Sequence, residues 1–227
     1  MALSSTMPEA ILFDLDGTLA DSLPTLASIT NDILRARSRA ELEPSRLRLF
    51  VGDGPAKLVE RALQATGGAA PQEIENAVAE FMALYEAAPV DGTLLYPGAA
   101  ACLDALSQAG IVLGICTNKP EAVSRLLLDG LGILDRFAAV VGGDTTTVRK
   151  PFAEPALEAC ARLGVDPSRS WFVGDSEHDV ACGRAAGCAA TVLVTHGYLR
   201  VPIEEVAADA AVGTLGEVAD LALRSRG

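Results

Sequence analysis

Short, continuous apolar runs recur along this chain and alternate with helix-like patterns. The runs occupy residues 10–13, 111–116, 138–141, 170–173 and 191–194. Each is typical of a strand that is buried on both faces of a parallel sheet. Between them, apolar residues recur every three or four positions and predict helices over about 98–109, 120–130, 153–163, 177–186 and 214–225. Strands that alternate with helices in this way predict an α/β fold with a doubly wound parallel sheet.

The segment between the first and second strands has a different pattern. Helical spacing, interrupted at Gly and Pro residues, predicts helices over about 21–36, 44–51, 55–65 and 71–86. We find no strand pattern between residues 20 and 93. We therefore predict a discontinuous core of residues 1–20 and 94–227, with an all-helical cap domain of residues 21–93 inserted after the first strand.

The composition favours a folded, acidic protein. The chain has 227 residues, which is enough for one large domain or two modest ones, and half of these residues are hydrophobic. The formal net charge is −12, and a surface this acidic repels nucleic-acid phosphates and anionic lipid head groups. We therefore expect no nucleic-acid partner and no membrane partner. An anionic substrate would need a metal ion or a local lysine to bind to such a protein.

The cysteines and the N-terminus indicate a reducing compartment. Without a Cys-x-x-Cys pair, we expect buried, reduced thiols at Cys102, Cys116, Cys160, Cys182 and Cys188. Two histidines are too few for a histidine-built zinc site. Residues 1–6 lack the basic and apolar regions of a signal peptide, and no apolar run approaches the roughly 18 residues that cross a bilayer. We predict a cytoplasmic protein.

The first strand is followed directly by Asp14-Leu15-Asp16-Gly17-Thr18. Side chains two positions apart on an extended segment point the same way, so Asp14 and Asp16 would face one crevice. That crevice would lie at the carboxyl end of the strand, where α/β sheets bind ligands. An ordinary Asp-Gly turn is the alternative. A calcium loop is excluded, because the twelfth position counted from Asp14 is Thr25 instead of Glu.

Polar residues follow the other strands as well. Thr117-Asn118-Lys119 follows the run at 111–116, and Lys150 lies shortly after the run at 138–141. Asp175 follows the run at 170–173, with Asp179 one helical turn further on. Carboxyl ends of parallel strands meet at one edge of a sheet, so we expect all of these groups in one place.

This set of groups suits phosphoryl transfer. The Asp14 and Asp175 carboxylates and the backbone carbonyl of Asp16 are hard oxygen ligands of the kind that Mg²⁺ prefers. The metal, Lys150 and the Thr117 hydroxyl can together hold a dianionic phosphoryl group. A carboxylate can then attack phosphorus to form an aspartyl-phosphate. Asp16 can protonate the leaving oxygen and afterwards take a proton from water.

These residues carry a family resemblance. DLDGT at 14–18, CTN at 116–118, Lys150-Pro151 and GDSEHD at 174–179 are similar, in order and spacing, to the four motifs of the haloacid dehalogenase (HAD) superfamily. The resemblance implies a Rossmann-like core, a helical cap and Mg²⁺. It also implies a nucleophile at Asp14, an acid/base at Asp16, phosphate holders at Thr117 and Lys150, and metal ligation by Asp14, Asp16, Asp175 and Asp179. Asp179 would act directly or through water, and substrate contacts would come from Gly17, Thr18 and Asn118.

Within the superfamily, the chain resembles the phosphoglycolate phosphatases most. Stretches at 49–63, 113–120, 140–144 and 172–188 carry this likeness. It implies that the turn Gly52-Asp53-Gly54 is a substrate-specificity loop, although an ordinary helix–helix turn is the alternative. The chain departs from the subfamily at Phe152-Ala153-Glu154, where His or a second Pro often follows the Lys-Pro pair.

The resemblance therefore implies an Mg²⁺-dependent phosphatase of a small phosphate monoester, with 2-phosphoglycolate as the preferred substrate. Pyrophosphate, a sugar phosphate or a nucleotide are alternative substrates. A phosphomutase is an alternative activity, and a non-catalytic regulatory protein is a third possibility. A dehalogenase would not need the carboxylate of Asp16. We expect a monomer or a homodimer.

Overall fold

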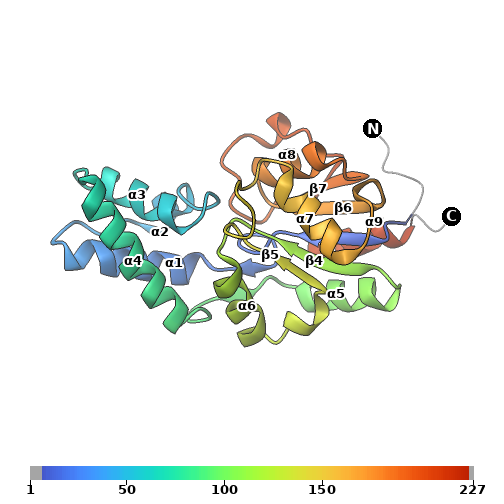
Figure 1. Cartoon of the computed structure of the whole chain (residues 1–227), viewed down its shortest axis with the longest axis horizontal. Coiled ribbons are helices and arrows are strands. Elements are labelled where there is room, and N and C mark those ends of the chain that lie inside the picture. The colour runs from blue at the N-terminus through green and yellow to red at the C-terminus, as the bar shows by residue number, and fades with distance from the viewer. Residues whose placement is uncertain (1–6, 225–227) are drawn as a thin grey trace.

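A parallel sheet organises the larger part of the molecule, which a computed structural model describes over residues 7–224 (Figure 1). The strands of these residues are β1 (Ala10–Phe13), β2 (Ala20–Asp21), β3 (Leu94–Leu95), β4 (Val112–Cys116), β5 (Ala139–Val141), β6 (Ser170–Gly174), β7 (Ala190–Val194) and β8 (Ala210–Val212). Within them, a six-stranded sheet has the order β5-β4-β1-β6-β7-β8, and every neighbouring pair is parallel. The predicted α/β fold class is confirmed.

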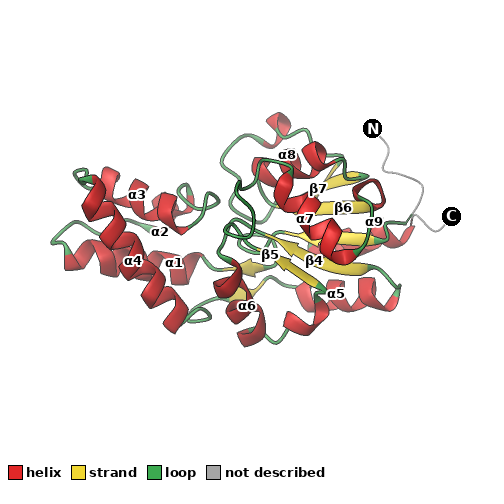
Figure 2. Ribbon diagram, viewed as in Figure 1, coloured by secondary structure: helices red, strands yellow, loops and turns green. Residues whose placement is uncertain are grey.

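Helices cover both faces of this sheet (Figure 2). They are α5 (Ala99–Gln108), α6 (Glu121–Gly130), α7 (Glu154–Leu163), α8 (Glu177–Ala186) and α9 (Leu215–Arg224). Side chains alternate along β1: Ile11 and Phe13 pack in one apolar cluster with α5 and α9, whereas Leu12 packs in another with α7 and α8. Burial on both faces explains why the strands appear in the sequence as unbroken apolar runs.

Four helices form a separate helical unit between β2 and β3, namely α1 (Leu23–Ala36), α2 (Pro44–Arg48), α3 (Pro55–Ala65) and α4 (Pro71–Ala87). In Figure 1 this unit lies beside the carboxyl ends of the sheet strands. It has its own apolar core, in which Phe81 and Tyr85 of α4 are fully buried. Val123 and Tyr198, which belong to the sheet part, complete that core. The domain boundaries at 20/21 and 93/94 stay a prediction.

Several predicted elements differ from the observed ones. Residues 44–51 form a helix only as far as Arg48, and turns follow. The short antiparallel ribbon of β2 and β3 was not predicted; β2 lies at the start of the segment in which we found no strand pattern, β3 lies just after its end, and the ribbon joins the two ends of the helical unit. Strand β8 was not predicted, because an Ala-Ala-Val segment at the sheet edge has little strand propensity of its own. The signal-peptide prediction concerns residues 1–6, which lie outside the described residues.

Candidate active site

The site begins at the centre of the sheet, where β1 lies between β4 and β6. After β1 the chain forms β4 and β5 on one flank of β1 and then β6 on the other flank. The loops that follow β1, β4 and β6 therefore meet at a switch point of the sheet. Phe13 is in register with Ile115 on one side and with Val173 on the other. Asp14, Thr117 and Asp175 therefore all lie within two residues of the same row of the sheet.

Lys150 is a buried cation at this edge of the sheet. Its Nζ lies 2.6 Å from Asp179 Oδ1 and 2.9 Å from Asp14 Oδ1, and its side chain is 2 % exposed. Burial lowers the pKa of Lys150, but the Asp14 and Asp179 carboxylates outweigh it and shift the pKa upward. Lys150 therefore remains an ammonium that holds two carboxylates together.

The carboxylates around Lys150 are themselves in an unfavourable environment. Burial raises the pKa of Asp14 to about 6, although Lys150 opposes the shift. Burial, with Asp179 and Asp14 nearby, raises the pKa of Asp175 well above its usual range. The ammonium of Lys150 pairs with only two of these three buried acids, Asp14 and Asp179, so a second cation would relieve the excess negative charge.

Asp14, Asp175 and Asp179 can offer that cation a set of oxygen ligands. One carboxylate oxygen from each lies within 4.8 Å of the other two. Asp14 Oδ1 is buried and, within residues 7–224, has the Lys150 ion pair but no aligned hydrogen bond. Asp179 Oδ2 is already taken by the backbone N–H and hydroxyl of Ser176. The donor set fits a hard divalent cation bound mainly by Asp14 and Asp175.

Thr18 and two glycines fix the orientation of Asp175. The Thr18 hydroxyl donates to Asp175 Oδ1 at 2.9 Å, and the Tyr198 backbone N–H donates to Oδ2 at 2.5 Å. Gly17 has a φ of +86°, and a Cβ there would collide with Asp175 Oδ2. A Cβ at Gly197 would collide with the same oxygen. These glycines allow the backbone to pack directly against the carboxylate.

Asp16 has different partners from Asp14. Its Oδ1 accepts hydrogen bonds from Lys119 Nζ and from the Ser22 hydroxyl, both at 2.6 Å. Lys119 Nζ also contacts the hydroxyl of Tyr85 from α4 and lies 4.7 Å from the centre of its ring. Asp16 is thus oriented by one residue from the sheet part and one from the start of the helical unit.

Asn118 connects the helical unit to Lys150. Its side-chain amide donates to the carbonyl of Gly52 at 2.9 Å and to the carbonyl of Lys150 at 3.2 Å. Its amide oxygen accepts the backbone N–H of Lys150 at 3.0 Å. The Gly52-Asp53-Gly54 turn, which precedes α3, is therefore bonded to the loops of the sheet.

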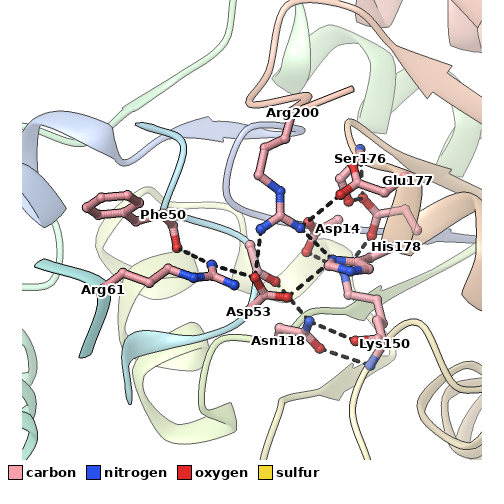
Figure 3. A network of polar contacts seen from close by, with 12 residues as sticks. Asp14, Phe50, Asp53, Arg61, Asn118, Lys150, Ser176, Glu177, His178 and Arg200 are labelled. Carbon is pink, nitrogen blue, oxygen red and sulfur yellow. Dashed lines mark hydrogen bonds and ion pairs between the residues drawn. The ribbon is translucent and has the colours of Figure 1, made fainter. Parts of the chain in front are cut away.

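A group of charged residues surrounds Asp53 (Figure 3). Asp53 Oδ2 lies 2.6 Å from both Arg200 of the sheet part and Arg61 of α3, and Oδ1 lies 3.4 Å from His178. Burial alone would raise the pKa of Asp53, but its bonds to the two arginines lower it overall. Arg200 also lies 2.9 Å from Glu177, so it bridges the turn to α8.

A cleft lies between these two groups of loops and opens to solvent. The sheet part and β1 loop contribute polar groups from Asp14, Asp16, Thr117, Asn118 and Lys119. The helical unit contributes a mainly apolar wall of Leu26, Val51, Gly52, Gly54, Pro55, Leu58 and Tyr85. A small polar molecule could bind at the polar end while the helical unit covers it.

Comparison with known proteins agrees with this geometry. Residues 11–193 match the family model described as haloacid dehalogenase-like hydrolase. The chain belongs to the haloacid dehalogenase-like hydrolase family. It is 42 % identical to the phosphoglycolate phosphatase of Rhodospirillum rubrum, over 94 % of this chain and 90 % of that protein. It is 39 % identical to that of Chromobacterium violaceum, over 94 % and 96 %.

A solved structure shares the whole fold of this family member. The crystal structure of a predicted phosphoglycolate phosphatase from Haemophilus somnus superposes with a TM-score of 0.89 at 28 % identity, covering 96 % of this chain and 98 % of that one. The predicted resemblance to the haloacid dehalogenase superfamily and its phosphoglycolate phosphatases is confirmed. The likeness extends through the helical unit, because nearly all of both chains superpose.

The structure brings the predicted site residues together around one edge of the sheet. Asp14, Asp16, Thr117, Asn118, Gly52 and Gly54 line the cleft, and Lys150, Asp175, Asp179, Gly17 and Thr18 lie against Asp14 or one another. Asp53 is not among the residues that line the cleft and pairs with Arg200 and Arg61. The sequence analysis placed Lys119 at this edge without giving it a role, and it did not include Ser22, Tyr85, Tyr198 or Arg200 in the site. Only Lys119 had a local signal, because it directly follows Thr117 and Asn118.

Two predictions outside the site can also be compared with the structure. The cysteines are free thiols, and Cys102, Cys116, Cys160 and Cys182 are buried as expected, whereas Cys188 is partly exposed. Within residues 7–224, no helix is both long enough and apolar enough to cross a membrane. The cytoplasmic location, the partners and the oligomeric state stay predictions.

Proposed function

We propose that this protein is an Mg²⁺-dependent phosphatase that hydrolyses 2-phosphoglycolate through an aspartyl-phosphate intermediate. The observation that carries the proposal is Asp14: a buried carboxylate at the switch point of the sheet that lines the cleft and lies beside Lys150. A nucleophile needs access to the substrate next to a group that attracts the phosphate. The names of the relatives supply the substrate.

In this proposal the groups around Asp14 hold the phosphoryl group. Lys150 and the Thr117 hydroxyl would bind its non-bridging oxygens, so that phosphorus lies in line with the Asp14 oxygen. Asp14 and Asp175 would hold Mg²⁺, and Asp179 would support it through water. When bound, Mg²⁺ would neutralise charge on the phosphoryl oxygens and on these carboxylates. The excess of buried negative charge supports this assignment.

The reaction would then need one proton donor and acceptor. Asp14 forms a bond to phosphorus as the bond to the ester oxygen breaks, and Asp16 gives its proton to that oxygen. A water molecule next attacks the phosphoryl group, and Asp16 takes a proton from it as the Asp14–phosphorus bond breaks. Because Ser22 and Lys119 orient the Asp16 carboxylate, it would point into the cleft in both steps.

A panel of phosphate esters tests this function. Released phosphate would be measured for 2-phosphoglycolate, pyrophosphate, a sugar phosphate, a nucleotide and p-nitrophenyl phosphate, each with Mg²⁺ and with EDTA. We expect the highest kcat/KM with 2-phosphoglycolate and no turnover in EDTA. Full activity in metal-free protein would contradict the metal assignment. A higher kcat/KM for another ester would change the substrate, and transfer of the phosphoryl group without its release would indicate a mutase.

A further inference from the structure

Lys119 is the one cationic residue among those that line the cleft, within the described part of the chain. Lys150, the other buried lysine, lies between Asp14 and Asp179 instead. The cleft otherwise presents two carboxylates and a largely apolar wall. A second negative group on a substrate would have to meet Lys119 there, because burying an unpaired charge is costly.

The ammonium of Lys119 is held in place yet not fully bonded. Among residues 7–224, its acceptors are Asp16 Oδ1, at 2.6 Å, and the Tyr85 hydroxyl. An ammonium has three N–H donors, so one remains available. The Tyr85 ring, 4.7 Å from Nζ, adds a cation–π contact that restricts where the side chain can lie. Lys119 is therefore positioned like a binding group.

The distance to Asp16 connects Lys119 with the leaving group. This step rests on the proposed function, in which Asp16 gives its proton to the ester oxygen. Since Lys119 Nζ is 2.6 Å from Asp16 Oδ1, atoms attached one or two bonds beyond that ester oxygen lie within reach of Nζ. In 2-phosphoglycolate, a carboxylate is separated from the ester oxygen by one methylene group.

We propose that Lys119, oriented by Tyr85 of the helical unit, binds the carboxylate of the leaving group. It thereby selects phosphate monoesters that carry an anionic group close to the phosphate. The alternative is that Lys119 only orients Asp16 and ties the helical unit to the sheet. The two roles differ in one respect: only the first depends on the charge of the substrate.

The test compares two substrates that differ at the carboxylate. 2-Hydroxyethyl phosphate has the same two-carbon chain as 2-phosphoglycolate, with a hydroxymethyl group in place of the carboxylate. In Lys119→Met, we expect the ratio of their kcat/KM values, 2-phosphoglycolate over 2-hydroxyethyl phosphate, to fall about 10- to 100-fold, the range for losing a charged hydrogen bond. If Lys119 only orients Asp16, both values fall together and the ratio stays as in the wild type.

Two more variants keep the test decisive. Lys119→Gln can still donate hydrogen bonds to Asp16 and Tyr85 but has no charge, so its ratio of kcat/KM values should fall as in Lys119→Met. It replaces Lys119→Met as the test variant if Lys119→Met does not fold. Lys57→Met removes an exposed lysine of α3, paired at 2.6 Å with Glu60, and should leave the ratio unchanged. An unchanged ratio in folded Lys119→Gln would overturn the proposal.

The outcomes also separate this inference from the proposed function. If the wild type releases phosphate without preferring 2-phosphoglycolate over 2-hydroxyethyl phosphate, both the proposed substrate and the role of Lys119 are wrong. If the wild type has the preference and both Lys119 variants keep it, the inference alone is wrong.

Discussion

The two walls of the cleft hold their charged groups in different ways. Behind the sheet wall, Lys150 pairs with Asp179, and these two side chains are 2 % and 1 % exposed. Beside the helical wall, Asp53 of the turn pairs with Arg200 of the sheet part, and these two side chains are 21 % and 17 % exposed. Removing one partner from a buried pair strands a charge and costs roughly 3–5 kcal/mol, whereas the cost is smaller at a partly exposed pair because water can solvate the charge that is left.

This difference indicates a division of roles. The sheet wall is a fixed arrangement, because no member of the Asp14–Lys150–Asp179 group can leave without exposing another to an apolar interior. The Asp53–Arg200 contact is partly exposed, so water can replace a partner there more readily than at Lys150. We infer that the sheet wall carries the reaction and that the helical wall adjusts to the substrate.

Replacement of Asp14 should produce the largest effect. Asp14→Asn keeps the shape of the side chain but removes the nucleophile, so release of phosphate should fall by several decades. The variant should remain folded, because Asn has the same volume and the pKa of Asp14 is already raised by burial. Phosphate release and the thermal midpoint would be measured on the same preparation. Residual activity above about one per cent would argue against a covalent role.

The sequence predicted the sheet wall much better than the helical wall. Asp14, Thr117, Lys150 and Asp175 each follow an apolar run, and the rule that ligands bind at the carboxyl ends of parallel strands brings them together. The connection between Arg200 and Asp53 joins residues that are 147 positions apart, and although the Gly52-Asp53-Gly54 turn marks Asp53, no local pattern marks Arg200. Nothing near Tyr85 marks it as a partner of Lys119, because its spacing on α4 is that of any core residue.

The pH dependence of stability gives the next largest effect and tests the fixed sheet wall. In metal-free protein, Asp14 has a pKa of about 6, compared with about 3.9 in an unfolded chain. Between these values the folded state binds more protons than the unfolded state, so this group makes stability fall as pH rises. Asp14→Asn has no acid at this position, so its stability does not fall with pH for this reason. The variant should therefore gain about 2 kcal/mol relative to the wild type between pH 4 and pH 7.

Urea unfolding of both proteins at each pH measures this difference. Asp53, with its lowered pKa, contributes with the opposite sign in both proteins, whereas the charge of Asp14 helps to raise the pKa of Asp175, so that Asp14→Asn also relieves Asp175. Added Mg²⁺ should raise the stability of the wild type at pH 7 and leave that of Asp14→Asn nearly unchanged. A free-energy difference that does not vary with pH would mean that Asp14 is already charged and compensated without metal.

The smallest effect should come from the turn of the helical wall, and two glycines provide a matched comparison. Gly54 and Gly110 have φ values of +87° and +84°, so Ala at either position strains the backbone similarly, by about 1 kcal/mol. Only at Gly54 would a new Cβ meet another segment, 3.0 Å from the carbonyl oxygen of Asn118, whereas Gly110 has open space. Gly54→Ala should therefore push the turn away from the cleft, and Gly110→Ala should not.

The expected signature is a change in substrate preference rather than a general loss. In Gly54→Ala, kcat/KM for 2-phosphoglycolate should fall about fivefold, or about 1 kcal/mol of transition-state stabilisation. For p-nitrophenyl phosphate, whose good leaving group depends less on closure, it should change less than about twofold. Gly110→Ala should leave both values near those of the wild type. Equal losses for both substrates in Gly54→Ala would mean that this turn belongs to the fixed framework, and that the contrast between the two walls does not extend to substrate selection.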